Sequence, residues 1–285
     1  MAAASADGLK EAEAAIAELG YEFLDGSRLT KVGTKGTAGF EWAGEVAYNA
    51  LGDAVERYIQ RRMESEFGLV RTTVAGVSGE GHPVPVWASA GATDGEGTLL
   101  LLIQGSGAVR PGQWARSLCI NATLDDGACL RALRCARERG WETLVLNPNH
   151  PSAGDPRAHA RSVSDAIVAP SRARRVAVLA HSAGGMAAAE LLRHGGRELC
   201  DRVAAVALTD AIHDVAPDDP AHVREVYAWR CVDWCSGLQG GGAGVTRAPD
   251  GVEIRPAGHP KHEWATAAAH DAVFEWLDDQ LAAWD

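Results

Sequence analysis

The sharpest local signal in the sequence is Val178-Leu179-Ala180-His181-Ser182-Ala183-Gly184-Gly185. An apolar run typical of a buried strand leads into it, and small residues typical of a tightly packed helix follow it. A serine at a tight strand-to-helix turn, with a small residue two positions before and after it, is the pattern of a nucleophile elbow. Ala180 stands where that pattern usually has its first glycine, and its side chain is still small. The pattern favours Ser182 as a nucleophile; the alternatives are a tight strand-to-helix turn that merely needs small residues, or an anion-binding turn.

Apolar runs on both sides of this turn predict a parallel sheet. Continuous hydrophobic segments occur at residues 99–103, 143–146, 176–180 and 203–208, and helices are expected between them at 114–140 (partly interrupted at 125–127), 156–168 and 184–193. Strands that are apolar on both faces belong to parallel sheets covered by helices. The alternation therefore predicts an α/β fold with a doubly wound, mostly parallel sheet.

Shorter elements are expected at both ends of this pattern. Before it, we expect an N-terminal helical and β-hairpin extension, with a helix at 9–19, a loop at 26–39, an amphipathic helix at 41–66 and two short strands at 69–75 and 84–90. After it come an ambiguous apolar segment at 223–234, a Gly-rich loop at 237–244, a strand at 252–255 and a helix at 265–284. The chain has no internal repeat and no clear linker, so we expect a single domain over 1–285, with 1–18 as a loosely ordered N-terminus.

Composition excludes some classes of function. The 27 Lys and Arg against 38 Asp and Glu give a net charge of −11, which argues against direct binding of nucleic acid through its phosphates. The 46% hydrophobic and 23% charged residues are typical of a globular protein. The longest strongly apolar run, 99–103, is far shorter than the roughly 20 residues of a membrane-spanning helix. With no basic and apolar leader and no CxxC pair among its six cysteines, the chain is expected in the cytoplasm or the nucleus.

Candidate partners for Ser182 follow it in the order that this type of site requires, first an acid and then a histidine. Asp210 comes directly after the apolar run 203–208, and His262 lies between the last expected strand and the last helix. The competing acids are Asp214 and Asp233, and the competing bases are His259 and His213.

The oxyanion donors are expected on two segments. The N–H of Ala183 opens the helix after Ser182, and Ser106 or Gly107 would supply a second N–H from the loop after the strand 99–103. Arg110 and Gln113, which follow that loop, are candidates for holding a polar or anionic acyl substituent, and Asn147 lies at the end of another strand.

Neither a metal nor a cofactor is predicted. His262-Glu263-Trp264-Ala265-Thr266 begins like a zinc-protease motif but has Thr where the second His belongs. The glycines at 105, 107 and 240–242 lack the spacing of dinucleotide or phosphate loops.

Several segments in fixed order carry a family resemblance. They are Ile103-Gln104-Gly105-Ser106-Gly107-Ala108-Val109-Arg110-Pro111-Gly112-Gln113-Trp114-Ala115-Arg116, Leu146-Asn147-Pro148-Asn149, the Ser182 motif, Ala207-Leu208-Thr209-Asp210-Ala211-Ile212-His213, Cys231-Val232-Asp233-Trp234 and Ala257-Gly258-His259-Pro260-Lys261-His262-Glu263. Together they resemble the Argonaute-binding protein two (Arb-two) domain family, which includes cotranscriptional regulators of animals. The resemblance runs from about Leu19 to Leu277.

This resemblance implies an α/β-hydrolase-like fold and, as in some members, a catalytic set of Ser182, Asp210 and His262. It also implies association with Argonaute in small-RNA silencing, as for the fission-yeast relative, while other members are appended to histone deacetylases and lack an intact nucleophile. Two hypotheses follow. The first is a serine hydrolase acting on an ester or amide of a small acyl substrate; the second is a protein-binding module of gene silencing or cotranscriptional regulation.

Overall fold

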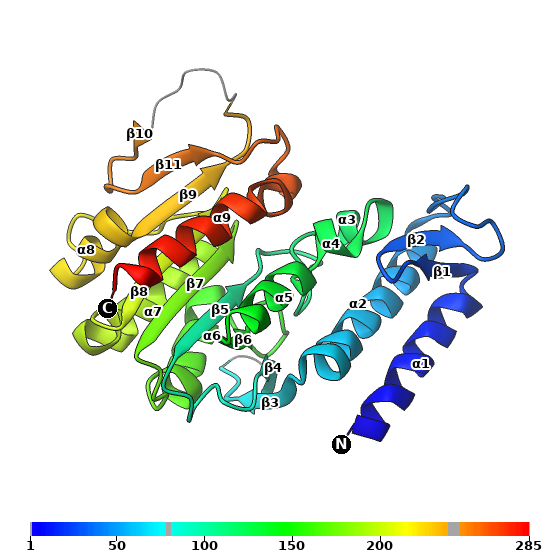
Figure 1. The fold of residues 1–285 in the computed structure, drawn as a ribbon, viewed down its shortest axis with the longest axis horizontal. Helices are drawn as coiled ribbons and strands as arrows, with labels where there is room; N and C mark the ends of the chain where they lie inside the picture. The colour runs from blue at the N-terminus through cyan, green and yellow to red at the C-terminus, as the bar shows by residue number, and fades with distance from the viewer. Residues whose placement is uncertain (1, 78–80, 239–245, 285) are drawn as a thin grey trace.

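One large, mostly parallel sheet runs through the protein (Figure 1). The computed structural model describes residues 2–77, 81–238 and 246–284. Within that part the sheet has nine strands in the order β10-β11-β9-β8-β7-β5-β6-β4-β3. Their bounds are β3 Val70–Val74, β4 Val84–Ala88, β5 Thr98–Ile103, β6 Glu142–Val145, β7 Arg175–His181, β8 Val203–Thr209, β9 Cys231–Cys235, β10 Thr246–Arg247 and β11 Glu253–Pro256.

The central strands are parallel, and the antiparallel pairs lie toward the two edges. β6, β5, β7, β8, β9 and β11 pair in parallel, whereas β4 is antiparallel to β3 and β6, and β10 is antiparallel to β11. This arrangement confirms the predicted α/β-hydrolase-like fold class. Because the parallel strands share a direction, the residues that follow β5, β6, β7, β8 and β9 meet at one edge of the sheet.

Helices cover both faces of the sheet, which explains why the sequences of the strands are uninterrupted apolar runs. In β5, Leu100 and Leu102 face one core, while Leu101 and Ile103 face the other, and all four are almost completely buried. One core is shared with α1 Ala2–Glu18, α2 Glu45–Phe67, α3 Arg116–Asn121, α4 Leu124–Gly127, α5 Leu130–Glu138 and α9 Ala265–Ala282; the other with α6 Pro156–Val163, α7 Gly184–Cys200 and α8 Ala221–Arg230. Burying one such side chain contributes roughly 1.5–3 kcal/mol, so both faces stabilise the sheet.

Several element boundaries differ from the sequence-based expectation. The helix expected at 114–140 is three helices, because Thr123 caps α4 by accepting the N–H of Asp126 at 3.1 Å and so starts a new helix. The helix expected at 156–168 ends in a π-helical turn, Ser164–Val168. The ambiguous segment 223–234 resolves into α8 followed by β9.

The N-terminal region also differs. The expected loop at 26–39 contains β2 Arg28–Lys31, which pairs with β1 Tyr21–Leu24 in a separate antiparallel hairpin. The helix expected at 9–19 is part of α1, whose Ala12 and Ile16 are buried. Most of the expected Gly-rich loop at 237–244 lies outside the described residues. Within the described ranges, no helix is both long enough and apolar enough to cross a bilayer.

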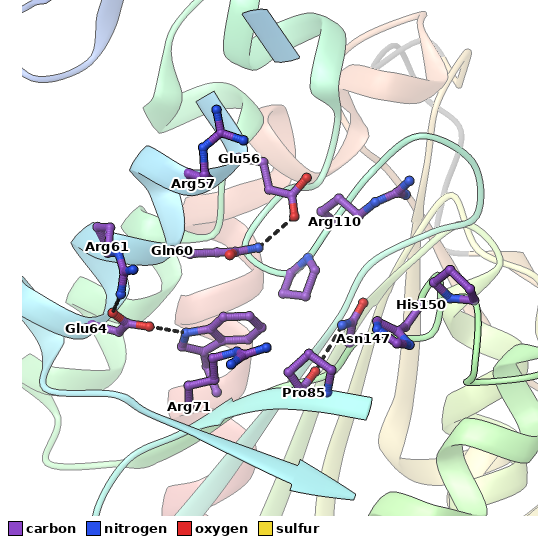
Figure 2. Close-up of a pocket in the computed structure, with 13 residues that line it drawn as sticks. Glu56, Arg57, Gln60, Arg61, Glu64, Arg71, Pro85, Arg110, Asn147 and His150 are labelled. Carbon is purple, nitrogen blue, oxygen red and sulfur yellow. Dashed lines mark hydrogen bonds and ion pairs between the residues drawn. The ribbon is translucent and has the colours of Figure 1, made fainter. Parts of the chain in front are cut away.

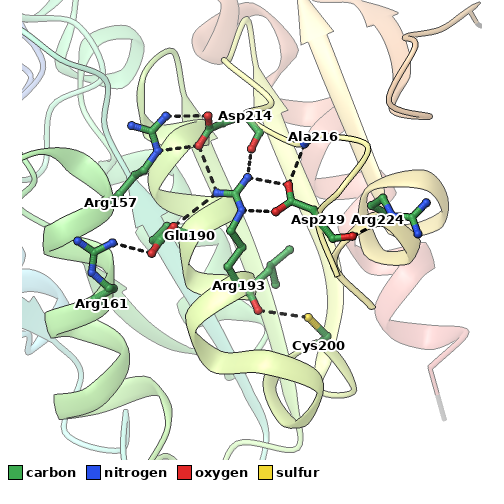
Figure 3. Close-up of polar contacts among 10 residues, drawn as sticks. Arg157, Arg161, Glu190, Arg193, Cys200, Asp214, Ala216, Asp219 and Arg224 are labelled. Carbon is green, nitrogen blue, oxygen red and sulfur yellow. Dashed lines mark hydrogen bonds and ion pairs between the residues drawn. The ribbon is translucent and has the colours of Figure 1, made fainter. Parts of the chain in front are cut away.

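A cluster of ion pairs fixes the segment that follows β8 (Figure 3). The guanidinium group of Arg193, on α7, donates to both carboxylate oxygens of Asp219 at 2.6 and 2.9 Å. It also contacts Asp214, whose carboxylate accepts two further hydrogen bonds from Arg157 of α6 at 2.9 and 2.7 Å. Burial opposes ionisation of Asp214, but the hydrogen bonds and charges of the two arginines outweigh it and lower its pKa. The segment that follows Asp210 is thereby held against α6 and α7.

Candidate active site

Ser182 occupies a strained turn between β7 and α7. Its φ is 54°, in the left-handed region that costs a residue with a side chain about 1–3 kcal/mol. The turn is held by its neighbours, because the Ser182 N–H donates to the carbonyl of Thr209 at 3.2 Å and its own carbonyl accepts from the Ile212 N–H at 3.0 Å. The half-buried serine therefore lies beside the end of β8, in the conformation that a nucleophile elbow requires.

Close packing explains the small residues around this serine. A Cβ atom on Gly185 would lie 2.1 Å from the carbonyl oxygen of Ile212. A Cβ atom on Gly105, in the loop after β5, would lie 2.8 Å from the Cβ of Ser182. Glycine at these positions lets the loop after β5 and the segment after β8 approach the serine from two sides.

Asp210 and His262 form a pair at the same edge of the sheet. The Nδ1 of His262 lies 2.7 Å from the Oδ2 of Asp210. Asp210 also accepts hydrogen bonds from the hydroxyl and the backbone N–H of Ser236. Burial raises the pKa of Asp210, but these hydrogen bonds from Ser236 and His262 lower it further than burial raises it. An ionised Asp210 keeps the proton of a neutral His262 on Nδ1, which leaves Nε2 able to accept a proton.

His262 and Ser182 are neighbours but are not hydrogen-bonded. The rings of His262 and His181, the residue before the serine, are tilted by 31° with centroids 4.7 Å apart. Among the hydrogen bonds of the described residues, none joins Ser182 Oγ to His262. In enzymes without a bound substrate such contacts are often long and tighten on binding, so the separation is compatible with a triad.

The competing residues are engaged elsewhere. Asp214 belongs to the arginine cluster described above. His213 lies between Asp233 and Asp250, at 3.1 and 2.7 Å from their carboxylates. His259 accepts the N–H of Lys261 and lies against the ring of Trp264. In the Asp210–His262 pair, by contrast, the histidine ring contacts His181, the residue before the serine.

The loop after β5 lies where the second oxyanion donor was expected. Ser106 and Gly107 are exposed there, and Ala183 precedes the first residue of α7. In the described part of the chain, the backbone N–H groups of these three residues have no hydrogen-bond acceptor. Asn149 fixes the loop from β6 by donating to the carbonyls of Gly105 at 2.7 Å and Val109 at 3.1 Å.

The three expected substrate contacts are placed differently. Gln113 is only 1% exposed, and its side-chain carbonyl accepts the N–H of Arg110 at 3.0 Å, so it supports the loop. Arg110 donates to the carbonyls of Gly107 and Val109, and part of it lines a cavity. Asn147 is buried, donates to the carbonyl of Pro85 at 3.0 Å, and lines the same cavity. Ser182 and His262 do not line that cavity.

The sequence did not predict a role for two residues of the site. Ser236 holds Asp210, and nothing in the sequence marks it, because its position depends on β9 lying beside β8. His181 lies within the Ser182 motif, and its Nδ1 lies 2.8 Å from the carbonyl of Thr209. Burial, aided by the nearby His262, lowers the pKa of His181 to about 4. His181 is therefore neutral, donates from Nδ1 and presents an uncharged ring to His262.

The fold and this site define a protein of the α/β-hydrolase-like class. The model of the Arb2 domain matches residues 150–237. A FAM172 family protein homologue of Caenorhabditis elegans is 31% identical over 93% of this chain and 87% of its own length. A cotranscriptional regulator ARB2A homologue of Dictyostelium discoideum is 26% identical over 93% of this chain and 80% of its own.

The chain belongs to the Arb2 domain family, which is the Arb-two family of the sequence analysis. Among solved structures, the histone deacetylase Clr3 is similar with a TM-score of 0.55 and 12% identity. That match covers 86% of this chain and 46% of the deacetylase chain, and it concerns the fold alone.

Proposed function

We propose that the protein is a serine hydrolase that cleaves an ester or amide bond of a small acyl substrate. The observation that carries the proposal is the Asp210–His262 pair at the sheet edge where Ser182 occupies its strained turn. Strain of this kind persists where the surrounding structure enforces it, and it keeps the hydroxyl of the serine exposed at the top of the sheet.

The proposed reaction has two halves, acylation of Ser182 and hydrolysis of the acyl-enzyme, and the same groups act in both. Ser182 Oγ attacks the substrate carbonyl carbon while His262 Nε2 takes the hydroxyl proton. The N–H groups of Ala183 and of Ser106 or Gly107 bind the oxyanion of the tetrahedral intermediate. Collapse of the intermediate breaks the bond to the alcohol or amine, which leaves with the proton from His262. Water then attacks the acyl-enzyme by the same steps and releases the acid.

Hydrolysis of p-nitrophenyl acetate and butyrate by the purified protein tests this proposal. We expect turnover above the buffer rate that Ser182→Ala reduces to background and that His262→Ala reduces on the order of 10³-fold or more. The matched control is His259→Ala, which removes the neighbouring histidine and should leave the rate within about twofold of the unsubstituted protein. Turnover that survives in Ser182→Ala would contradict the proposal.

A second candidate function comes from the names of the relatives, which are called cotranscriptional regulators. We propose, as the alternative, a non-catalytic module that binds a protein of the gene-silencing machinery in the nucleus, with Argonaute as the first partner to test. The acidic net charge of −11 is compatible with a protein partner and unfavourable for RNA itself. If the tagged protein and its Ser182→Ala variant recover Argonaute equally well, the result would support this function. No recovery of Argonaute would contradict it.

A further inference from the structure

A cavity of about 430 Å³ lies between α2, the strands β3 and β4, and the segments that follow β5 and β6 (Figure 2). This volume is in the range of small-molecule sites. The segments that follow β5 and β6 line one side of it, near the sheet edge at which Ser182 lies, but neither Ser182 nor His262 lines it. It has no part in the chemistry proposed above.

Positive charge is concentrated at this cavity in an otherwise acidic protein. Of the residues that the structure describes, four arginines line it against two glutamates: Arg57, Arg61, Arg71, Arg110, Glu56 and Glu64. Arg61 pairs with Glu64 at 2.8 Å, but Glu56 accepts its hydrogen bond from Gln60 instead of an arginine.

Two of the arginines lack a carboxylate partner within the described chain, whereas the charge of Arg110 acts on the carboxylate of Glu56. Within the described chain, neither Arg57 nor Arg71 forms an ion pair, and Arg110 donates only to backbone carbonyls. Burial and the guanidinium groups of Arg71 and Arg110 together lower the pKa of His150, as expected beside positive charge.

One residue that lines the cavity, Asn147, carries a buried acceptor without a partner in the described chain. Asn147 is 3% exposed, and its Nδ2 donates to the carbonyl of Pro85, which fixes the orientation of the amide. Among the described residues its Oδ1 has no hydrogen-bond partner, and Figure 2 shows this oxygen turned away from Pro85. A buried acceptor without a partner is unfavourable by about 1–3 kcal/mol, so a ligand that supplies a donor there would be favoured.

We propose that this cavity binds a small anionic molecule that carries a phosphate or carboxylate group for the arginines and a hydroxyl or N–H donor for Asn147. Guanidinium groups bind both kinds of anion through charge-assisted hydrogen bonds. Trp87 and Pro85, both buried, form an apolar wall for the carbon skeleton between the two polar ends.

Isothermal titration calorimetry with four probes tests the proposal. Glycerol 1-phosphate and glycerate carry an anion and hydroxyl groups, propyl phosphate carries the anion alone, and glycerol carries no charge. We expect binding of glycerol 1-phosphate, of glycerate, or of both, and the stronger of the two identifies the anion. Glycerol 1-phosphate should bind several-fold more tightly than propyl phosphate, and glycerol should not bind.

The variant Arg57→Gln/Arg71→Gln should weaken binding of the preferred anion by about tenfold or more, because each lost arginine removes a charge-assisted hydrogen bond. Both side chains are exposed, so the variant should fold. The control Arg172→Gln/Arg174→Gln removes two exposed arginines elsewhere and should leave the affinity unchanged. No binding of any anion at millimolar concentration, or equal loss in both double variants, would overturn the proposal.

Discussion

At the scale of single residues, the proposed catalysis by Ser182 requires that Asp210 hold His262 in one tautomer. The carboxylate accepts from Nδ1 of the histidine at 2.7 Å and is itself held by Ser236. An amide in place of the carboxylate keeps the shape of the side chain but removes its charge. Its N–H group can donate to Nδ1 of the histidine, which would place the imidazole proton on Nε2, where the serine proton should be accepted.

For Asp210→Asn we therefore expect ester hydrolysis to fall on the order of 10³- to 10⁴-fold while the thermal unfolding temperature changes little. Ser236→Ala leaves the carboxylate and its bond to His262 in place, so we expect a loss of about tenfold or less. Measured rates of both variants on the same ester check this order. A larger loss in Ser236→Ala than in Asp210→Asn would contradict the role given to Asp210.

At the scale of elements, the arginine cluster holds the segment after β8 against α6 and α7. Arg193→Ala would leave the carboxylate of Asp219 without its arginine partner and the carboxylate of Asp214 with Arg157 alone. Allowing for partial solvent screening, we expect a loss of about 2 kcal/mol in the free energy of unfolding by urea. The control Arg161→Ala breaks a more exposed pair with Glu190 and should cost less than about 1 kcal/mol. Equal losses would show that the cluster does not hold this segment.

The observed elements also show which parts of the fold could be predicted from the sequence. The central strands and the Ser182 turn were predictable, because continuous apolar runs and small residues at the turn follow directly from burial on two faces. The β1–β2 hairpin was missed, since its short strands lie in a Gly- and Thr-rich stretch with no clear alternation. Ser236 and the cavity could not be predicted, because each needs residues far apart in sequence to meet across neighbouring strands.

At the scale of the whole molecule, buried histidines predict how stability depends on pH. Burial lowers the pKa of His159 and of His181 to about 4, and both are neutral in the fold. An unfolded chain, whose histidines titrate near pH 6.5, binds more protons than the folded protein between pH 6.5 and about 4. Stability is therefore fully present above pH 6.5 and is lost as the pH falls through this window.

Between pH 7 and pH 5 each of these two histidines should lower the free energy of unfolding by about 2 kcal/mol. His213 opposes the trend: burial lowers its pKa, but Asp233 and Asp250 raise it further, so it adds stability at acidic pH. Urea unfolding of the protein and of His159→Gln at pH 7, 6 and 5 isolates one contribution. We expect a shallower dependence in the variant, and an unchanged slope would contradict the assignment.

The central claim, that Ser182 is a working nucleophile, is tested most directly by reaction with a fluorophosphonate and localisation of the adduct by peptide mass spectrometry. We predict one stoichiometric adduct on Ser182. We also predict that it forms far more slowly in His262→Ala and not at all in Ser182→Ala. An unmodified Ser182 after prolonged reaction near neutral pH, or an adduct on another residue, would contradict the account.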